Sequence, residues 1–358
     1  MHKPRILMTS VGGLVAPNMM RSLRHSTDNN IFIVGVDAKH DAVGFHFADK
    51  SYVVLPGESE GYGRQLLNIA EKENIDVVLP LSDEELLALA SYKRRFEKKG
   101  ICVACSEFEV VKTALDKGLM LQFLKDKGLP CPDFRIPNSL KELERSVLEL
   151  GYPKKRVVFK PRRGRGARGF WLLDDDLDKK KMILESRERQ QITLGWLLEA
   201  LDGKGRFPDI LVMEYLSGSD FNVDVLAWRG DSFYIVPNER LVPDAGPVQV
   251  GCIRRDKKVG EVVRRVVKEF NFDYYVNVEV AYRNISEPFV YEINPRISAP
   301  IVANKAAGID LLNYGIRLAL GERVSTGLRI KETRMFRFWD EVFIHSQKNS
   351  NKKAKGFN

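Results

Sequence analysis

The first third of the chain alternates short apolar runs with amphipathic segments. Helical patterns run from Pro17 to about residue 24 and over residues 63–73. The apolar, strand-like runs occupy residues 6–10, 31–37, 51–56 and 75–80. Strands that are apolar on both faces are typical of a parallel sheet with helices on each side. We therefore expect an α/β fold that begins with a doubly wound parallel-sheet domain over about the first 105 residues.

The pattern changes in the middle of the chain. A helix expected at 116–127 is followed by the stop signal and linker Gly128-Leu129-Pro130-Cys131-Pro132, and a second helix is expected at 139–150. Two short strands, 156–160 and 170–173, flank a Gly/Arg loop as in a hairpin.

The strands of the last third have a different character. From about residue 210 they alternate apolar and polar residues, which predicts an antiparallel sheet with one face on a core and the other on a cleft. These strands are expected at 210–215, 221–229, 232–237, 276–282 and 289–294. Beyond about residue 346 the periodicity stops, and we expect a disordered, lysine-rich tail.

The composition restricts the class of protein. Hydrophobic residues make up 44% and charged residues 29%, which is ordinary for a globular protein. No apolar stretch is long enough to span a membrane, and no secretory signal pattern is present. Four cysteines do not make a disulfide framework in a chain of this length, so we expect a cytoplasmic protein without a membrane partner.

The positive charge is concentrated in two segments. The net charge is +9, and residues 154–168 contain eight basic residues and no acid, while residues 348–358 contain four lysines. These segments total +12, so the remainder of the chain sums to −3. One concentrated patch favours a phosphate-bearing small ligand over a broad nucleic-acid surface, although a nucleic-acid-binding protein using residues 154–168 and the tail is the alternative.

The Gly/Arg loop is the first candidate for chemistry. Lys160 ends a buried strand, and Gly164, Gly166 and Gly169 follow it. Glycines let a backbone approach a ligand closely, and its N–H groups can hold phosphate oxygens beside the lysine ammonium. A solvated hairpin turn with its arginines in water fits the same residues, and the loop is not a Walker P-loop.

Two neighbouring strands supply the second candidate. Asn277 and Glu279 share one face of a strand, and Glu292 and Asn294 share one face of the next. Carboxylates that converge between apolar positions repel each other, and Mg²⁺ with phosphate oxygens would relieve that repulsion. A polar stripe facing solvent, or pairing of Arg296 with Glu292, is the alternative.

Residues 212–224 are a third candidate. A strand ends near Leu216, turns at Gly218 and restarts. An adenine ring could hydrogen-bond the strand-end backbone while a nearby carboxylate holds the ribose, although an ordinary hairpin explains the same pattern.

Together these segments resemble the ATP-grasp enzymes, most closely the carbamoyl-phosphate-synthase large-chain type and its single-unit carboxylate–amine ligase relatives. The resemblance covers about residues 5–345. It rests on Lys160 with its loop, on the 214–216 hinge, and on Glu279 with the run 292–296. Residues 76–86 are similar to the pre-grasp domain of that group, and Asp116-Lys117 is similar to the opening of its next domain.

The resemblance implies ATP and Mg²⁺ (or Mn²⁺) as cofactors and assigns roles to individual residues. It implies phosphate contacts at Lys117, Lys160, Gly164, Gly166 and Arg240. It also implies an adenine hinge at Glu214, Tyr215 and Leu216, with a ribose contact at Asp220. The implied metal ligands are Glu279, Glu292 and Asn294, and the implied catalytic residues are Lys160 and Arg296, which steadies the acyl phosphate. Two residues depart from the family pattern. Asp220 replaces the usual Glu, and Glu279 stands where several members have Gln.

The expected organisation follows from this resemblance. It comprises a pre-ATP-grasp α/β domain (1–115), an ATP-grasp fold of two α+β subdomains (116–205 and 206–346), and a basic tail (347–358). The implied activity is an ATP-dependent ligase that phosphorylates a small-molecule carboxylate and couples it to an amine. A non-catalytic ATP sensor is a further alternative, and an oligomer is compatible with the sequence.

Other motifs point away from different chemistries. Cys102 and Cys105 have redox spacing but lie in a strand-like run, so core thiols are expected. His40 and His46 lack partner ligands and are expected at the surface. The G-x-G-x-x-G dinucleotide pattern is absent near Gly12 and Asp37.

Overall fold

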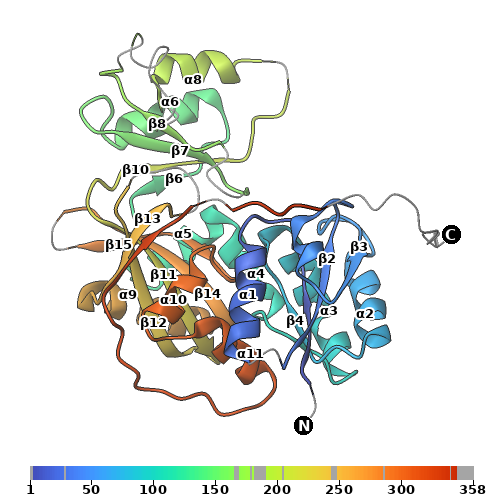
Figure 1. Cartoon of the computed structure of the whole chain (residues 1–358). Coiled ribbons are helices and arrows are strands. Elements are labelled where there is room, and N and C mark those ends of the chain that lie inside the picture. Colours follow the sequence, from blue (N-terminus) through green and yellow to red (C-terminus); the bar gives the residue numbers. More distant parts are fainter. Residues whose placement is uncertain are drawn as a thin grey trace.

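The computed structural model describes residues 3–27, 30–164, 169–177, 180, 191–203, 205–242, 248–284, 287–338 and 340–344. Three sheets organise this part of the chain (Figure 1). The expected disordered tail and the loop residue Gly166 lie outside the described residues. Every helix of the described ranges is too short or too polar to cross a membrane.

The first sheet is parallel throughout, with the strand order β3-β2-β1-β4-β5. Its strands are β1 (Arg5–Met8), β2 (Phe32–Asp37), β3 (Lys50–Val53), β4 (Val77–Leu79) and β5 (Cys102–Val103). The segments between them form α1 (Ala16–Ser26), η1 (Val43–His46), α2 (Tyr62–Lys72) and α3 (Asp83–Glu97), and α4 (Phe108–Leu115) follows β5. Ile6 and Met8 pack in one core and Leu7 packs in another, so both faces of β1 are covered. The predicted doubly wound domain is confirmed.

The second sheet lies above the other two in Figure 1 and shares a core with the third. Its order is β6-β10-β7-β8-β9, with β6 (Phe134–Arg135), β7 (Val157–Pro161), β8 (Trp171–Leu173), β9 (Gln191–Ile192) and β10 (Ile210–Glu214). Helices α6 (Leu140–Glu149) and α8 (Leu194–Leu201) share a core with β7 and β10. The predicted hairpin of β7 and β8 is confirmed by their antiparallel pairing.

One strand is in a different sheet from the one predicted. The sequence places residues 210–215 among the strands of the last third, but β10 pairs with β7 and β6 in the second sheet. Four of its five residues are buried, so the strand lies inside the sheet between two neighbours. The domain limits 1–115, 116–205 and 206–346 stay a prediction.

The third sheet is antiparallel, with the order β15-β14-β11-β12-β13-β16. Its strands are β11 (Asp220–Trp228), β12 (Asp231–Arg240), β13 (Val250–Ile253), β14 (Tyr274–Tyr282), β15 (Pro288–Asn294) and β16 (Thr333–Phe336). Helices α9 (Lys257–Phe270) and α5 (Lys117–Asp126) share one core with it, while α10 (Ile301–Ala306) and α11 (Leu311–Ala319) join it to the core around α1. The second and third sheets therefore meet near β7, β15 and α5.

The predictions for the histidines and for Cys105 are confirmed, whereas Cys102 is half-buried rather than fully in the core. All four cysteines are free, Cys105 is buried, and burial raises the pKa of its thiol to about 12. The Sγ atom of Cys102 lies 3.0 Å from the hydroxyl of Tyr274. His40 and His46 are exposed.

Candidate active site

Two lysines from different elements meet Glu292 where the second and third sheets approach each other. Lys160, near the end of β7, places its Nζ 3.3 Å from a carboxylate oxygen of Glu292 on β15. Lys117, the first residue of α5, lies 3.9 Å from the other oxygen and donates to the carbonyl of Gly164 at 3.0 Å. The base of the glycine loop, the start of α5 and the third sheet therefore converge on one carboxylate.

The charges of this group are strongly coupled. Burial alone would raise the pKa of Glu292, but the ammonium groups of Lys160 and Lys117 outweigh it and hold that pKa below its usual value. Burial and the Lys117 charge lower the pKa of Lys160, while Glu292 opposes the shift. The two ammonium groups beside Glu292 are cationic donors suited to an anionic ligand such as a triphosphate.

A row of polar side chains extends from Glu292 across the cleft face of the third sheet. Glu279 on β14 is the direct cross-strand partner of Glu292, and Asn294 donates to Glu279 at 3.3 Å. Arg240 on β12 lies 3.1 Å from Asp220 on β11 and 3.9 Å from Glu279. The structure thus brings together the predicted metal ligands, the predicted ribose contact and the additional predicted phosphate contact.

Tyr291 is a member of this cluster that the sequence pattern does not indicate. Strand alternation would direct its side chain away from the cleft because Glu292 points into it. Glu279 on β14 pairs with Glu292 on β15, but the next residue of β14, Val280, pairs with Val290. Tyr291 is therefore the extra residue of a β-bulge. Its hydroxyl lies 2.9 Å from oxygens of both Asp220 and Glu279.

Glu279 and Asp220 carry perturbed carboxyl groups. Burial and the neighbouring Glu292 raise the pKa of Glu279 to about 7, although Arg240 opposes the shift. Burial also raises the pKa of Asp220, again against Arg240. Crowding raises the pKa of these carboxyl groups, and a further cation among them would favour their ionised forms.

The donor set fits a hard divalent cation. Glu279 and Glu292 supply carboxylate oxygens, and rotation of the Asn294 amide would present its oxygen in place of the nitrogen that now faces Glu279. Within the described ranges, no cluster of three or more His, Cys, Asp or Glu side chains is arranged for a metal, so the amide would be an essential member of the set. Such a site is completed by phosphate oxygens or water, as is usual for Mg²⁺.

The raised pKa of Glu279 predicts pH-dependent metal binding. A metal ligand must be deprotonated, so Mg²⁺ affinity should rise about tenfold between about pH 6 and about pH 8. Between about pH 4.5 and about pH 7, and without metal, Glu279 is protonated in the folded chain but ionised in the unfolded chain. The contribution of Glu279 to the stability of the fold therefore falls as the pH rises through that range. Calorimetric Mg²⁺ titration at both pH values measures the effect.

Glu279→Gln supplies the control for this prediction because its amide does not titrate. Its Mg²⁺ affinity should be weaker and should vary less than about twofold over the same pH range. An affinity of the unsubstituted chain that does not change with pH would contradict the prediction.

The predicted adenine hinge follows β10. Glu214 forms a two-point ion pair with Arg283, at 2.7 and 2.9 Å, so its carboxylate is held by protein. The backbone N–H of Tyr215 donates to the carbonyl of Arg156 at 3.4 Å. The N–H of Leu216, in contrast, has no hydrogen-bond partner in the described part of the chain, and its side chain is buried. A free backbone donor beside an apolar surface is suited to the edge of a planar heterocycle.

The base of the glycine loop is fastened to α5. Asp116, at the N-cap of α5, accepts hydrogen bonds from Arg162 at 2.9 and 3.0 Å and from Arg163 at 3.3 Å. Its carboxylate also accepts from the N–H groups of Gly118 and Leu119. Asp116 therefore positions Lys117 relative to the loop.

Arg296 joins the third sheet to the first. Its guanidinium forms two hydrogen bonds of 2.9 Å with Asp83, which lies 213 positions earlier at the start of α3. Although burial acts in the opposite direction, Asp83 raises the pKa of Arg296, so the arginine stays charged. The sequence analysis singles out the segment that contains Asp83, but it does not predict the contact of Asp83 with Arg296.

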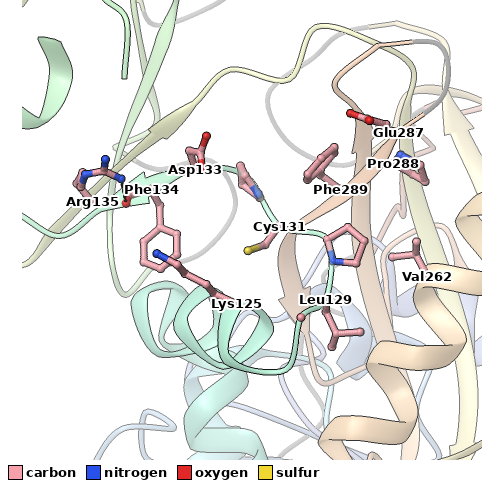
Figure 2. A pocket seen from close by; sticks show the side chains of 13 residues that line it. Lys125, Leu129, Cys131, Asp133, Phe134, Arg135, Val262, Glu287, Pro288 and Phe289 are labelled. Carbon is pink, nitrogen blue, oxygen red and sulfur yellow. Dashed lines mark hydrogen bonds between the residues drawn. The ribbon is translucent and has the colours of Figure 1, made fainter. Parts of the chain in front are cut away.

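A separate hollow of about 540 Å³ lies behind the hinge (Figure 2). Figure 2 shows Cys131, Phe134 and Phe289 around it, on the linker before β6, on β6 and on the first part of β15, respectively. None of the predicted site residues lines this hollow. Its link to the hinge is the 2.9 Å hydrogen bond from the N–H of Glu214 to the carbonyl of Asp133.

Two family models match separate parts of the chain. Residues 206–337 match the family described as ATP-grasp in the biosynthetic pathway with Ter operon. Residues 6–104 match the family described as PylC-like, N-terminal domain.

Sequence relatives are found among carbamoyl phosphate synthase large chains. The protein from Pseudothermotoga lettingae is 23% identical over 276 residues, which are 73% of this chain and 23% of the relative. The protein from Thermus thermophilus is 25% identical over 271 residues, which are 72% of this chain and 24% of the relative. The chain thus spans about a quarter of the length of these relatives.

Solved structures share the fold. The N5-carboxyaminoimidazole synthetase of Staphylococcus aureus complexed with ADP has a TM-score of 0.69 at 16% identity, covering 94% of this chain and 82% of the other. The biotin carboxylase domain of Hydrogenobacter thermophilus 2-oxoglutarate carboxylase, complexed with MgADP and bicarbonate, has a TM-score of 0.66 at 19% identity, covering 90% and 71%. The chain shares the fold of these solved structures. More particularly, its residues 6–104 match a PylC-like N-terminal family model and its residues 206–337 match an ATP-grasp family model, which confirms the resemblance.

Proposed function

We propose that this chain is an ATP- and Mg²⁺-dependent ligase that activates a small-molecule carboxylate and couples it to an amine. The observation that carries the proposal is the contact of Lys160 and Lys117 with Glu292, at 3.3 and 3.9 Å. It brings cationic groups of one subdomain to the proposed metal ligands of the other. A chain with these residues on separate surfaces would offer no nucleotide cleft.

The proposed reaction has two steps. A carboxylate oxygen of the substrate attacks the γ-phosphorus of ATP, the bond to ADP breaks, and an acyl phosphate forms. The amine then attacks the acyl carbon and loses a proton, and inorganic phosphate leaves. The metal, when bound, neutralises charge on the phosphate oxygens.

The side chains of the cleft would act by position and charge. Lys160 and Lys117 would bind phosphate oxygens, and Glu279, Glu292 and Asn294 would hold the metal. The two-point contact of Arg296 with Asp83 would keep its guanidinium oriented toward the transferred group. The free N–H of Leu216 would bind the adenine edge and Asp220 the ribose. None of these roles needs a covalent protein nucleophile.

Pairing within the basic segment supports a small ligand over nucleic acid. Arg162 and Arg163 contact Asp116, and Arg156 lies 2.8 Å from Asp174. Charges neutralised by neighbours contribute less to binding a phosphate backbone. A reducing, cytoplasmic location fits the four free thiols and belongs to the same proposal.

Replacing Lys160 should weaken nucleotide binding. A charge-assisted hydrogen bond contributes about 1.5–3 kcal/mol, so Lys160→Met should raise the Kd of MgATP by about tenfold or more. Lys155→Met, at an exposed lysine before β7, should bind as tightly as the unsubstituted chain. Calorimetry with a non-hydrolysable ATP analogue measures both variants.

Turnover is tested separately from binding. With MgATP and pools of carboxylates and amines, the unsubstituted chain should release ADP. Failure to bind MgATP would overturn the whole proposal, whereas binding without ADP release from any pool would indicate the non-catalytic sensor instead.

A further inference from the structure

Arg337 directly follows the last strand of the third sheet, and its side chain lies beside the turn that follows Arg296. Its backbone N–H donates to the carbonyl of Gln249 at 2.8 Å and thereby continues the pairing of β16 with β13. Its guanidinium donates to the carbonyls of Val248 at 3.1 Å and Ala299 at 3.4 Å. Arg337 thus joins the sheet edge to the turn between the proposed catalytic arginine and α10.

The sheet register places Arg337 on the cleft face. Arg240 opposes Gly251, and Gly251 opposes Met335, so these three residues share a face. Arg337 is two residues beyond Met335, and side chains alternate along a strand, so it belongs to the same face. That face carries Arg240 beside Asp220 and continues to Glu279 and Glu292.

Arg337 differs from the other arginines of this region in lacking an acidic partner. Arg240 contacts Asp220 and Arg296 contacts Asp83. Arg337 has no carboxylate at ion-pair distance in the part of the chain that the structure describes, and its side chain contacts only neutral carbonyl groups. Burial lowers the pKa of its guanidinium, with no neighbouring acid to oppose the shift.

A half-buried cation that contacts only neutral carbonyl groups among the described residues is stabilised further by a ligand that supplies negative charge. The two carbonyl contacts fix the plane of the guanidinium while leaving its other N–H groups available. A fixed planar fork matches the two oxygens of a carboxylate.

We propose that Arg337 binds a carboxylate group of the substrate. The inference rests on the proposed ligase function and adds to it the residue that recognises the carboxylate. The carboxylate has two possible sources, an organic acid and bicarbonate. Arg337 lies two strand spacings across the sheet from Arg240 and two residues further along, so their backbones are about 12 Å apart, which favours an organic substrate that extends from the phosphate contacts to Arg337.

The test measures carboxylate binding in the presence of MgADP. The probes are glutarate, its uncharged diamide glutaramide, bicarbonate and inorganic phosphate, each titrated by calorimetry. The variants are Arg337→Gln, Arg337→Lys and the control Arg334→Gln. Arg334 is an exposed arginine on β16, three residues before Arg337 and on the opposite face of the sheet. Arg334→Gln therefore removes the same charge from the same edge of the sheet as Arg337→Gln does.

Glutarate should bind the unsubstituted chain, and Arg337→Gln should weaken that binding at least about tenfold. Arg337→Lys keeps the charge without the fork and should lie in between, and Arg334→Gln should stay within about twofold of the unsubstituted chain. If bicarbonate is the only probe whose binding depends on Arg337, the carboxylate site is supported and bicarbonate is its ligand. Glutaramide should not bind.

Three results would overturn the inference: no probe binds the unsubstituted chain, carboxylate binding is unaffected in Arg337→Gln, or phosphate is the only ion whose binding depends on Arg337. MgADP affinity and the melting temperature show whether Arg337→Gln has folded, and Arg337→Lys replaces it if it has not. If MgADP fails to bind the unsubstituted chain, the proposed function fails and the titrations are repeated without nucleotide, so the two failures are distinguishable.

Discussion

Glu292→Gln is expected to slow ADP formation by about 10³-fold or more. The substitution removes the negative charge that Lys160 and Lys117 both contact. It leaves Glu279 as the one carboxylate among the proposed metal ligands. Loss of several kcal/mol of charge stabilisation in the transition state corresponds to a rate effect of this size. The measurement is ADP release with saturating MgATP, since weak nucleotide binding would otherwise mimic a slow step.

Glutamine has nearly the same shape as glutamate, so the Glu292→Gln variant should keep the fold. Circular dichroism and the melting temperature verify this. Glu287→Gln is the matched control, because Glu287 is an exposed acid just before the same strand and lines the hollow behind the hinge. It should turn over at the unsubstituted rate. ADP formation by Glu292→Gln within about tenfold of that rate would disprove the metal assignment.

Asp83→Asn is expected to reduce stability by about 3 kcal/mol and to slow turnover. The pair with Arg296 is mostly buried, with 14% and 19% of the two side chains exposed. Removing one charge leaves the other buried without a partner, which is the costly case for an internal ion pair. The asparagine keeps the size of the side chain at the start of α3, so the effect reports the charge. Urea unfolding gives the free energy.

A surface pair supplies the comparison for Asp83. Asp340 contacts Arg21 at 3.2 Å, but both side chains are about half exposed, so Asp340→Asn should change stability by less than about 1 kcal/mol. The double variant Asp83→Asn with Arg296→Gln should recover part of the loss, because no buried charge remains unpaired. Equal stability of the Asp83 and Asp340 variants would show that the Arg296 pair does not hold the first sheet to the third.

Local rules were sufficient wherever neighbouring residues decide the structure. The four apolar runs of the first third predict a parallel sheet because its strands are covered on both faces, and the observed sheet agrees. Alternation also predicts that Glu292 and Asn294 share a face, and both oppose polar residues of β14. The N-cap of α5 at Asp116 agrees with the helix expected from that residue.

Local rules failed where distant contacts decide. Strand β10 has the apolar pattern of a buried strand, but only its pairing with β7 determines to which sheet it belongs. The bulge at Tyr291 turns a side chain toward the cleft against the alternation of its strand. The partner of Arg296 is Asp83 at the start of α3, 213 positions earlier, and no local pattern connects the two residues.

The sequence by itself determined the α/β architecture and the hairpin around the glycine loop, because the periodicity of apolar positions is a local property. Its resemblance to the ATP-grasp enzymes indicated which residues to expect at the site. Only the tertiary structure decided which charges are neutralised: Arg296 is paired with Asp83, while Arg337 contacts only neutral carbonyl groups among the residues that the structure describes. The reason is physical, since the state of a buried charge depends on whichever groups surround it in space, however distant they are in the chain.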